Sequence, residues 1–285
     1  MIANPQETGT TAPSAGDAVV DFEDVNLAFG DAPALVHISF KMKAGETRVV
    51  LGAAGSGKTT LLKTAVGLVA PDSGRIRLFG QEVTGRKESQ LFDVRSKVGI
   101  LFQEGGLFDS LTIAENVAYP LLNQHALERH ALSEQEVEQR VVESLSFVEL
   151  EHTLDKFPSE LSGGMRRRVG IARSVVTAPQ LVLYDSPTAG LDPITANTII
   201  NLIIKGRDLR STATIMVTHR YQDGHLMAHF RYNPSSGKIE PAESSQLSTR
   251  FFVMKEGRLV FQGSEAELRA STDEYVQKFA RPGSS

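Results

Sequence analysis

The feature that most constrains the fold of this chain is the segment GAAGSGKT at residues 52–59. It matches the pattern G-x-x-x-x-G-K-[ST] and stands directly between a strand-like run, 47–51, and a helix-like run, 59–67. In this setting the glycines let backbone N–H groups point at phosphate oxygens, and the helix start adds the positive end of its dipole. Lys58 can neutralise charge on the β- and γ-phosphates, and Thr59 can ligate Mg²⁺. The segment predicts a nucleotide-phosphate loop; the alternative, an ordinary glycine-rich turn, needs a chance match on the order of one in a hundred.

Strand-like and helix-like runs alternate along the rest of the chain. Strands are predicted at residues 19–22, 35–40, 47–51, 75–79, 97–102, 181–184 and 214–217, and helices at 59–67, 133–149, 163–176 and 194–209. The run at 133–149 opens with a Ser-x-x-Glu pattern, which is typical of a helix start. Short apolar runs such as 181–184 are typical of buried parallel strands. The alternation predicts an α/β sheet core.

Composition excludes several classes of protein. Of the 285 residues 41% are apolar and 22% are charged, the balance of a folded globular chain and not of a disordered, collagen-like or coiled-coil one. The absence of cysteine excludes disulfides, cysteine-ligated zinc, iron–sulfur clusters and thiol nucleophiles. No run approaches the roughly 18 apolar residues of a membrane span, and the N-terminus lacks signal-peptide features. We therefore expect a protein that stays inside the cell.

Composition also divides the chain into segments. Residues 1–17 are rich in small and polar residues and are predicted to be a disordered extension. Residues 18–270 are predicted to form one domain, and residues 271–285 a C-terminal tail. Within the domain, residues 229–248 interrupt a helix-to-strand connection. This insertion is predicted either as a hairpin that turns at NPSSG or as a disordered surface loop.

Two further places carry residues suited to nucleotide chemistry. The apolar run LVLYD ends in Asp185, and a carboxylate at the end of a buried strand beside a phosphate loop is placed to hold Mg²⁺ or its water shell. The segment LSGGM at residues 161–165 precedes a helix for which Ser162 is a good N-cap. A capped helix start is the simple interpretation, but a serine and two glycines at a helix N-terminus also form a second anion site. One chain rarely needs two phosphate sites, whereas two chains that meet head to tail use both.

In the order GAAGSGKT, Gln103, LSGGM, LVLYD, AGLD and His219, the chain resembles the nucleotide-binding subunit of an ABC transporter over about residues 19–268. The resemblance implies an α/β fold of the P-loop NTPase class, with an N-terminal antiparallel β portion and a helical portion at about residues 104–176. It also implies a homodimeric ATPase. Two ATP molecules, with Mg²⁺, are then each held between the phosphate loop of one subunit and the LSGG segment of the other.

The resemblance also gives roles to single residues. Phe29 falls where an aromatic ring stacks on adenine, although a core phenylalanine at a strand end is the alternative. Gln103 falls where a glutamine reaches the metal and the attacking water. His219 falls where a histidine contacts the γ-phosphate, although a buried structural histidine is the interpretation favoured by the residue alone. Residues 189–192 match a loop that crosses the dimer interface. The expected nucleotide contacts are Phe29, Gly52, Ala53, Ala54, Gly55, Ser56, Gly57, Lys58, Thr59, Thr60, Leu161, Ser162, Gly163, Gly164 and Asp192, and the expected metal ligands are Thr59, Gln103 and Asp185.

A narrower resemblance rests on LFQEGGLFD at residues 101–109, ENVAYPL at residues 115–121, and Met165. These segments are similar to the ATPases of Mla and Mce-type lipid transport systems, which move phospholipids or other lipids between bacterial membranes. The resemblance implies integral membrane permease subunits, held by the stretch after Gln103, and an MCE-domain substrate-binding protein in the complex. It also implies a peripheral position on the cytoplasmic face of the inner membrane.

One residue departs from the family pattern. The family normally has glutamate after Asp185, where it polarises the attacking water, but here the residue is Ser186. A serine hydroxyl is a poor general base near neutral pH. Three interpretations remain: slow hydrolysis, hydrolysis with a carboxylate from elsewhere, and an ATP-binding regulatory module that scarcely hydrolyses. Because phosphoryl transfer depends mostly on positioning and charge neutralisation, we expect slow hydrolysis, with His219, Gln103 and Ser186 as the catalytic candidates.

Nucleic acid is not an expected partner. The net charge is −4, so the bulk charge gives no indication of nucleic-acid binding. The basic run at residues 166–168 is better explained as a solvated helix face with ion pairs. DNA-repair ABC ATPases carry very long coiled-coil or zinc insertions between the two nucleotide motifs, and this chain has neither such an insertion nor any cysteine.

Overall fold

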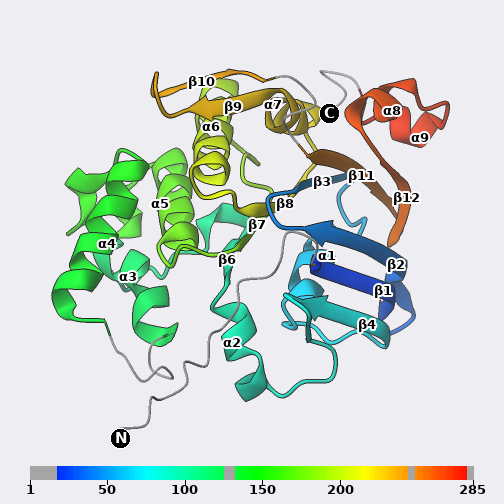
Figure 1. The fold of residues 1–285 in the computed structure, drawn as a ribbon, viewed down its shortest axis with the longest axis horizontal. Helices are drawn as coiled ribbons and strands as arrows, with labels where there is room; N and C mark the ends of the chain where they lie inside the picture. Colours follow the sequence, from blue (N-terminus) through cyan, green and yellow to red (C-terminus); the bar gives the residue numbers. More distant parts are fainter. Residues whose placement is uncertain (1–17, 125–131, 243–247, 281–285) are drawn as a thin grey trace, which may run out of the picture.

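The computed structural model describes residues 18–124, 132–242 and 248–280. The predicted disordered extension, residues 1–17, lies outside the described residues. The described part of the chain forms a mixed α/β core, with an antiparallel sheet on one side and a group of helices on the other (Figure 1). No helix in these three ranges combines the length and the apolar character that crossing a bilayer requires.

The core is a six-stranded sheet of order β12-β11-β3-β8-β7-β6. Five of its strands are parallel, and β12 pairs antiparallel with β11 at one edge. The central strands β3, β7 and β8 are buried along their whole length, which explains why the sequence shows continuous apolar runs there instead of alternation. The strands are β3 (Thr47–Gly52), β6 (Val98–Leu101), β7 (Leu181–Asp185), β8 (Ala213–Thr218), β11 (Thr249–Lys255) and β12 (Arg258–Gly263).

The predicted N-terminal antiparallel portion is a four-stranded sheet of order β2-β1-β4-β5. Its strands are β1 (Ala18–Phe29), β2 (Ala32–Lys43), β4 (Ser73–Leu78) and β5 (Gln81–Glu82). The rings of Phe22 and Phe40 stack at 4.8 Å, and Phe40 meets Phe252 of β11 edge-on at 5.2 Å. This aromatic contact joins the antiparallel sheet to the core sheet.

Helices pack on the core sheet, and those between residues 104 and 176 form the predicted helical portion. Three of them, α3, α4 and α5, lie together within residues 113–175 (Figure 1). Helix α4 begins as the Ser-x-x-Glu pattern predicts, because the Ser133 hydroxyl accepts from the amide of Glu136 and the Glu136 carboxylate accepts from the amide of Ser133. The helices are α1 (Lys58–Ala65), α2 (Phe92–Arg95), α3 (Ile113–Gln124), α4 (Glu134–Phe147), α5 (Gly163–Val175), α6 (Pro193–Arg210), α7 (Tyr221–His229), α8 (Glu265–Ala270) and α9 (Glu274–Gln277).

The insertion contains the predicted hairpin. Strands β9 (Phe230–Asn233) and β10 (Lys238–Pro241) pair antiparallel. The turn closes where the amide of Gly237, at φ 68°, donates to the Asn233 carbonyl at 2.8 Å. The hairpin interpretation is therefore confirmed over residues 230–241, and the alternative of a disordered loop is wrong there. Residues 243–247 lie outside the described residues.

The prediction of a C-terminal tail at residues 271–285 is wrong for residues 271–280. Asp273 caps α9 by accepting from the amides of Tyr275 and Val276. The side chains of Val276 and Phe279 are buried in the main core. The folded region therefore continues to residue 280, because a capped turn with apolar residues facing the sheet buries enough surface to hold the segment. Residues 281–285 lie outside the described residues.

Candidate functional site

Four loops of the site leave the carboxyl ends of parallel strands. The phosphate loop follows β3, Gln103 follows β6, Ser186 follows β7 and His219 follows β8. Parallel strands present their carboxyl ends at one edge of a sheet, so these loops meet there. They border a cleft of about 1150 Å³. The described residues that line the cleft are Phe29, Ala32, Pro33, Ala34, Ala54, Gly55, Gly57, Lys58, Thr59, Thr60, Gln103, Ser186, Ala189 and His219.

The phosphate loop needs glycine where the backbone turns tightly. Gly57 has φ 101°, and a Cβ at this position would lie 2.4 Å from the Ala34 carbonyl oxygen. At Gly52 a Cβ would lie 2.5 Å from the Met254 carbonyl oxygen, at the end of β11. Only glycine fits both positions without displacing backbone. Helix α1 starts at Lys58, so the amides of its first turn have no partner within the helix and face the loop.

The Lys58 ammonium lies inside the loop. It donates to the carbonyls of Gly52 at 2.8 Å and Ala53 at 2.7 Å, and to the Ser56 hydroxyl at 3.3 Å. Burial lowers the pKa of Lys58, and the negative charge of Asp185 opposes that shift. The loop thus holds a cation at its centre, as recognition of an anionic phosphate requires.

Asp185 and Ser186 form the end of β7. The Asp185 side chain is buried, and it lines a crevice together with Thr59. Carboxylate and hydroxyl oxygens are the ligands that Mg²⁺ prefers, so this pair fits the metal expected from the sequence. The Ser186 hydroxyl donates to an Asp185 carboxylate oxygen at 3.2 Å. The backbone of Ser186 has φ 49°, a left-handed conformation that few non-glycine residues adopt.

Three residues from separate parts of the chain line the same cleft. Phe29 stands at the end of β1 with 57% of its surface exposed, so the alternative of a core phenylalanine is wrong. Gln103 begins a short 3₁₀ turn after β6 and is exposed. His219 is also exposed, which excludes a buried structural histidine. All three side chains are therefore accessible to a ligand in the cleft.

Three residues that the sequence analysis did not single out form a hydrogen-bonded group next to the cleft. The buried Asp223 of α7 accepts from the hydroxyls of Thr188 at 2.5 Å and Thr218 at 2.7 Å. Burial raises the pKa of Asp223, and these hydrogen bonds lower it. Asp223 thereby ties the loop after β7 to the end of β8, next to His219. The signal available in the sequence was an acidic residue on the otherwise apolar face of the helix that follows His219.

Arg167 connects the second glycine-rich segment to the same loop. Its guanidinium, on α5, donates to the carbonyls of Ser186 at 3.3 Å and Ala189 at 3.2 Å. The side chain is buried. The basic run at residues 166–168 therefore contains a structural arginine rather than a fully solvated one.

The LSGG residues and Asp192 lie outside this cleft. Ser162 caps α5, accepting from the Met165 amide at 3.3 Å, and both Ser162 and Gly163 are exposed. Asp192 caps α6 by accepting from the amides of Ile194 and Thr195, each at 3.0 Å. Hydrogen bonds from Thr195 keep the pKa of Asp192 below its ordinary value. The two helix starts form a second surface, separate from the residues that line the cleft.

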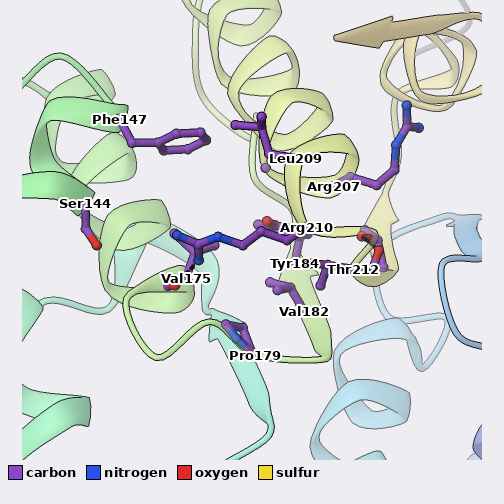
Figure 2. A pocket seen from close by; sticks show the side chains of 12 residues that line it. Ser144, Phe147, Val175, Pro179, Val182, Tyr184, Arg207, Leu209, Arg210 and Thr212 are labelled. Atoms are coloured by element: carbon purple, nitrogen blue, oxygen red, sulfur yellow. Dashed lines mark hydrogen bonds between the residues drawn. The ribbon is translucent and has the colours of Figure 1, made fainter. Parts of the chain in front are cut away.

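A second cavity lies between α4, α5, α6 and the sheet, and it does not contain the predicted site residues. Figure 2 shows it lined by Phe147 and Leu209, with Arg210 reaching across toward Val175 and Tyr184 at its base. Its empty volume is about 470 Å³. Burial raises the pKa of Tyr184. The cavity lies among packed helices, whereas most of the phosphate-loop residues line the larger cleft together with Phe29, Gln103 and His219.

Comparisons with known proteins agree with this geometry. A family model described as ABC transporter matches residues 35–189. The chain is 35% identical over 272 residues to the chloroplastic protein TRIGALACTOSYLDIACYLGLYCEROL 3 of Arabidopsis thaliana, covering 93% of this chain and 74% of that protein. It is 34% identical over 268 residues to the methionine import ATP-binding protein MetN of Corynebacterium jeikeium, covering 93% and 66%. It is 30% identical over 261 residues to the intermembrane phospholipid transport system ATP-binding protein MlaF of Escherichia coli, covering 92% and 88%.

The fold also matches solved structures. The ATP-binding cassette MJ0796, in a dimeric post-hydrolysis state bound to ADP and phosphate, aligns with a TM-score of 0.71 at 28% sequence identity. The alignment covers 86% of this chain and 98% of that one.

Proposed function

This chain belongs to the ABC transporter family, as an ATP-binding and ATP-hydrolysing subunit, and from that premise we propose that it powers lipid movement between membranes. The names of two relatives refer to lipids: that of the Arabidopsis protein to a galactolipid and that of MlaF to phospholipid. The segments at residues 101–109 and 115–121 support the same cargo class. A methionine import subunit is similarly close in sequence. The experiment below therefore compares how ATP hydrolysis responds to phospholipid and to methionine.

In this proposal two copies of the chain form a homodimer, and each ATP site needs residues from both copies. Each ATP lies between the cleft of one subunit and the exposed α5 start of the other, with Ser162 and the α5 amides on the terminal phosphate. Lys58 neutralises the β- and γ-phosphates, and Phe29 stacks on the base. Thr59, Gln103 and Asp185 hold Mg²⁺, which supplies charge neutralisation at the phosphates. The single observation that carries the shared site is the exposed, serine-capped start of a 13-residue helix outside its own cleft.

Hydrolysis is slow in this proposal because no glutamate follows Asp185 to polarise the attacking water. None of the described residues that line the cleft carries a carboxylate. His219 and Gln103 orient the γ-phosphate and the attacking water, and Lys58 stabilises the developing charge. The alternative is a regulatory module that binds ATP and scarcely hydrolyses it. Steady-state turnover of the assembled complex separates the two.

The permease docks on the segment between Gln103 and α3. The buried Asn116 builds this segment, because its amide donates to the carbonyls of Phe108, Leu111 and Thr112 and its oxygen accepts from the Phe108 amide. Two aromatic rings, those of Phe108 and Tyr119, are 42% exposed and lie 4.6 Å apart. A rigid loop that displays two aromatic side chains suits a protein–protein contact. This docking holds the subunit at the cytoplasmic face of the inner membrane.

The test is purification of the complex from the native membrane in detergent. We expect an integral permease, a single-span MCE-domain protein and co-purifying phospholipid, and ATP hydrolysis that responds to phospholipid and not to methionine. A methionine-binding partner with methionine-stimulated hydrolysis would overturn the lipid proposal.

For the docking surface, Phe108→Ser should abolish assembly while leaving ATP binding unchanged. Phe92→Ser is the matched control, because Phe92 on α2 is also 42% exposed.

A further inference from the structure

A cluster of metal-ligating side chains lies apart from the nucleotide cleft. His225 and His229 are one helical turn apart on α7, so both imidazoles lie on the same face of that helix. Glu265 begins α8 and reaches this face. Its carboxylate lies 2.9 Å from His225 Nδ1 and also contacts His229 Nε2. The three possible ligand atoms lie within 4.8 Å of one another.

We propose that His225, His229 and Glu265 bind a divalent transition-metal ion of the Zn²⁺ class. Two imidazole nitrogens and one carboxylate oxygen are a known ligand set for zinc, with water completing a four-coordinate site. Tetrahedral coordination at bond lengths of about 2.0–2.2 Å places ligand atoms roughly 3.4 Å apart, so the side chains need only small adjustments to enclose an ion. The site does not depend on the lipid cargo proposed above.

The surroundings suit a metal ligand set. The Glu265 side chain is 8% exposed, and its carboxylate accepts a hydrogen bond from the Tyr221 hydroxyl, which fixes its orientation. Burial raises the pKa of Glu265, but hydrogen bonds from Tyr221, His225 and His229 outweigh it and lower the pKa below its ordinary value. The histidine side chains are 32% and 37% exposed, which gives an ion and its water access from solvent.

The site has a structural consequence for the cleft. Helix α7 begins two residues after His219, and α8 leads into α9. On α9 the Tyr275 hydroxyl accepts from the Ala53 amide of the phosphate loop at 3.3 Å and donates to the Met254 carbonyl at 3.0 Å. A metal ion shared by α7 and α8 therefore fastens the C-terminal helices, and through them Tyr275, against the nucleotide core.

The test is direct titration with ZnCl₂. The full-length protein is made without a histidine tag, stripped with a chelator and studied by calorimetry, with Co²⁺ as a spectroscopic probe of coordination. We expect one Zn²⁺ per chain and a four-coordinate Co²⁺ absorption spectrum. His229→Ala and Glu265→Gln should each weaken Zn²⁺ binding at least tenfold. His152→Ala is the matched control, because His152 is an exposed histidine in a separate helical turn.

Two further measurements keep the proposal testable where a ligand variant unfolds. Tyr221→Phe keeps the packing of the ring and removes only the hydrogen bond to Glu265, and we expect it to weaken Zn²⁺ binding about 10–100-fold. In wild type, Zn²⁺ should slow amide exchange across residues 265–277. Sub-stoichiometric binding, or binding that His152→Ala weakens as much as Tyr221→Phe, would overturn the proposal. So would variants that change stability with no wild-type response to Zn²⁺, because the cluster would then be only a hydrogen-bonded contact between α7 and α8.

Discussion

Replacing Ser186 by glutamate is the sharpest test of the reasoning about hydrolysis. The Ser186 hydroxyl donates a hydrogen bond to the Asp185 carboxylate, so it is directed to that carboxylate and not to the attacking water. The Asp185 carboxylate is assigned to the metal, and none of the described residues that line the cleft carries another carboxylate. A glutamate at position 186 adds the missing proton acceptor beside Gln103 and His219. We therefore expect Ser186→Glu to raise the rate of ATP hydrolysis.

The magnitude follows from general-base catalysis and from the backbone at this position. General-base assistance is worth roughly 10²–10⁴-fold, or about 2.7–5.4 kcal/mol off the barrier at 1.36 kcal/mol per factor of ten. This range is a ceiling, because the glutamate must also hold a water at hydrogen-bond distance. The φ of 49° at Ser186 costs an L-residue roughly 1–2 kcal/mol. Serine, alanine and glutamate share that cost, so comparing them isolates the side chain, whereas glycine would remove it.

The assay is steady-state phosphate release by the assembled transporter at saturating Mg-ATP. Ser186→Ala should match wild type, and Ser186→Glu should be faster. Ser211→Glu is the matched control, because Ser211 also has φ 49° and is exposed at the end of α6, away from the cleft. A fast wild type that loses activity in Ser186→Ala would refute the missing-base argument. A fast wild type indifferent to both changes would assign the base to a carboxylate from elsewhere.

Three further predictions concern the rest of the site. Lys58→Ala should abolish tight Mg-ATP binding in equilibrium titration, because the loop loses its central cation; unchanged affinity would contradict the phosphate-loop assignment. Mixing Lys58→Ala with Ser162→Arg chains should restore some hydrolysis, since each heterodimer regains one intact site; heterodimers as inactive as the parents would rule out a shared site. Asp223→Asn should lower kcat without raising the KM for ATP, because it disturbs the Thr188 and Thr218 hydroxyls behind the cleft; a change in KM alone would argue against that positioning role.

The sequence predicted the parts of the fold that depend on local pattern. The runs at residues 47–51, 181–184 and 214–217 are the central strands, and the Ser133 cap marks the start of α4. These signals lie within one element, so periodicity and capping chemistry identify them without knowledge of the tertiary structure. The strands β1 and β2 are longer than predicted, because bulges interrupt their alternation. Helix α3 was not predicted as a helix, since Pro120 lies inside it.

The contacts that the sequence did not predict join residues far apart in the chain. Asp223 meets Thr188 across 35 positions, and Tyr275 meets Ala53 across 222 positions. The acidic residue on an apolar helix face marks Asp223 but does not identify Thr188 as its partner, and the backbone amide of Ala53 has no sequence signature at all. The buried position of α9 was missed for the same reason, since a single turn carries too little periodicity to indicate which face is covered. The convergence of the cleft was predictable because parallel strands bring their carboxyl ends to one edge.

The second surface, at the starts of α5 and α6, is mechanically connected to the cleft that it does not line. A Cβ on Gly164 would lie 2.7 Å from Thr195 Cγ2, so the two helix starts are in close contact. From α5, the guanidinium of Arg167 donates to the carbonyls of Ser186 and Ala189, in the loop that borders the cleft of the same chain. Ser162, which would contact a nucleotide bound to the partner subunit, is therefore connected to Ser186 through α5 and the buried side chain of Arg167. Because interiors are close-packed, a shift of α5 repositions that loop rather than being absorbed. In the head-to-tail dimer proposed above, we therefore expect the occupancy of one site to alter the position of this loop at the other.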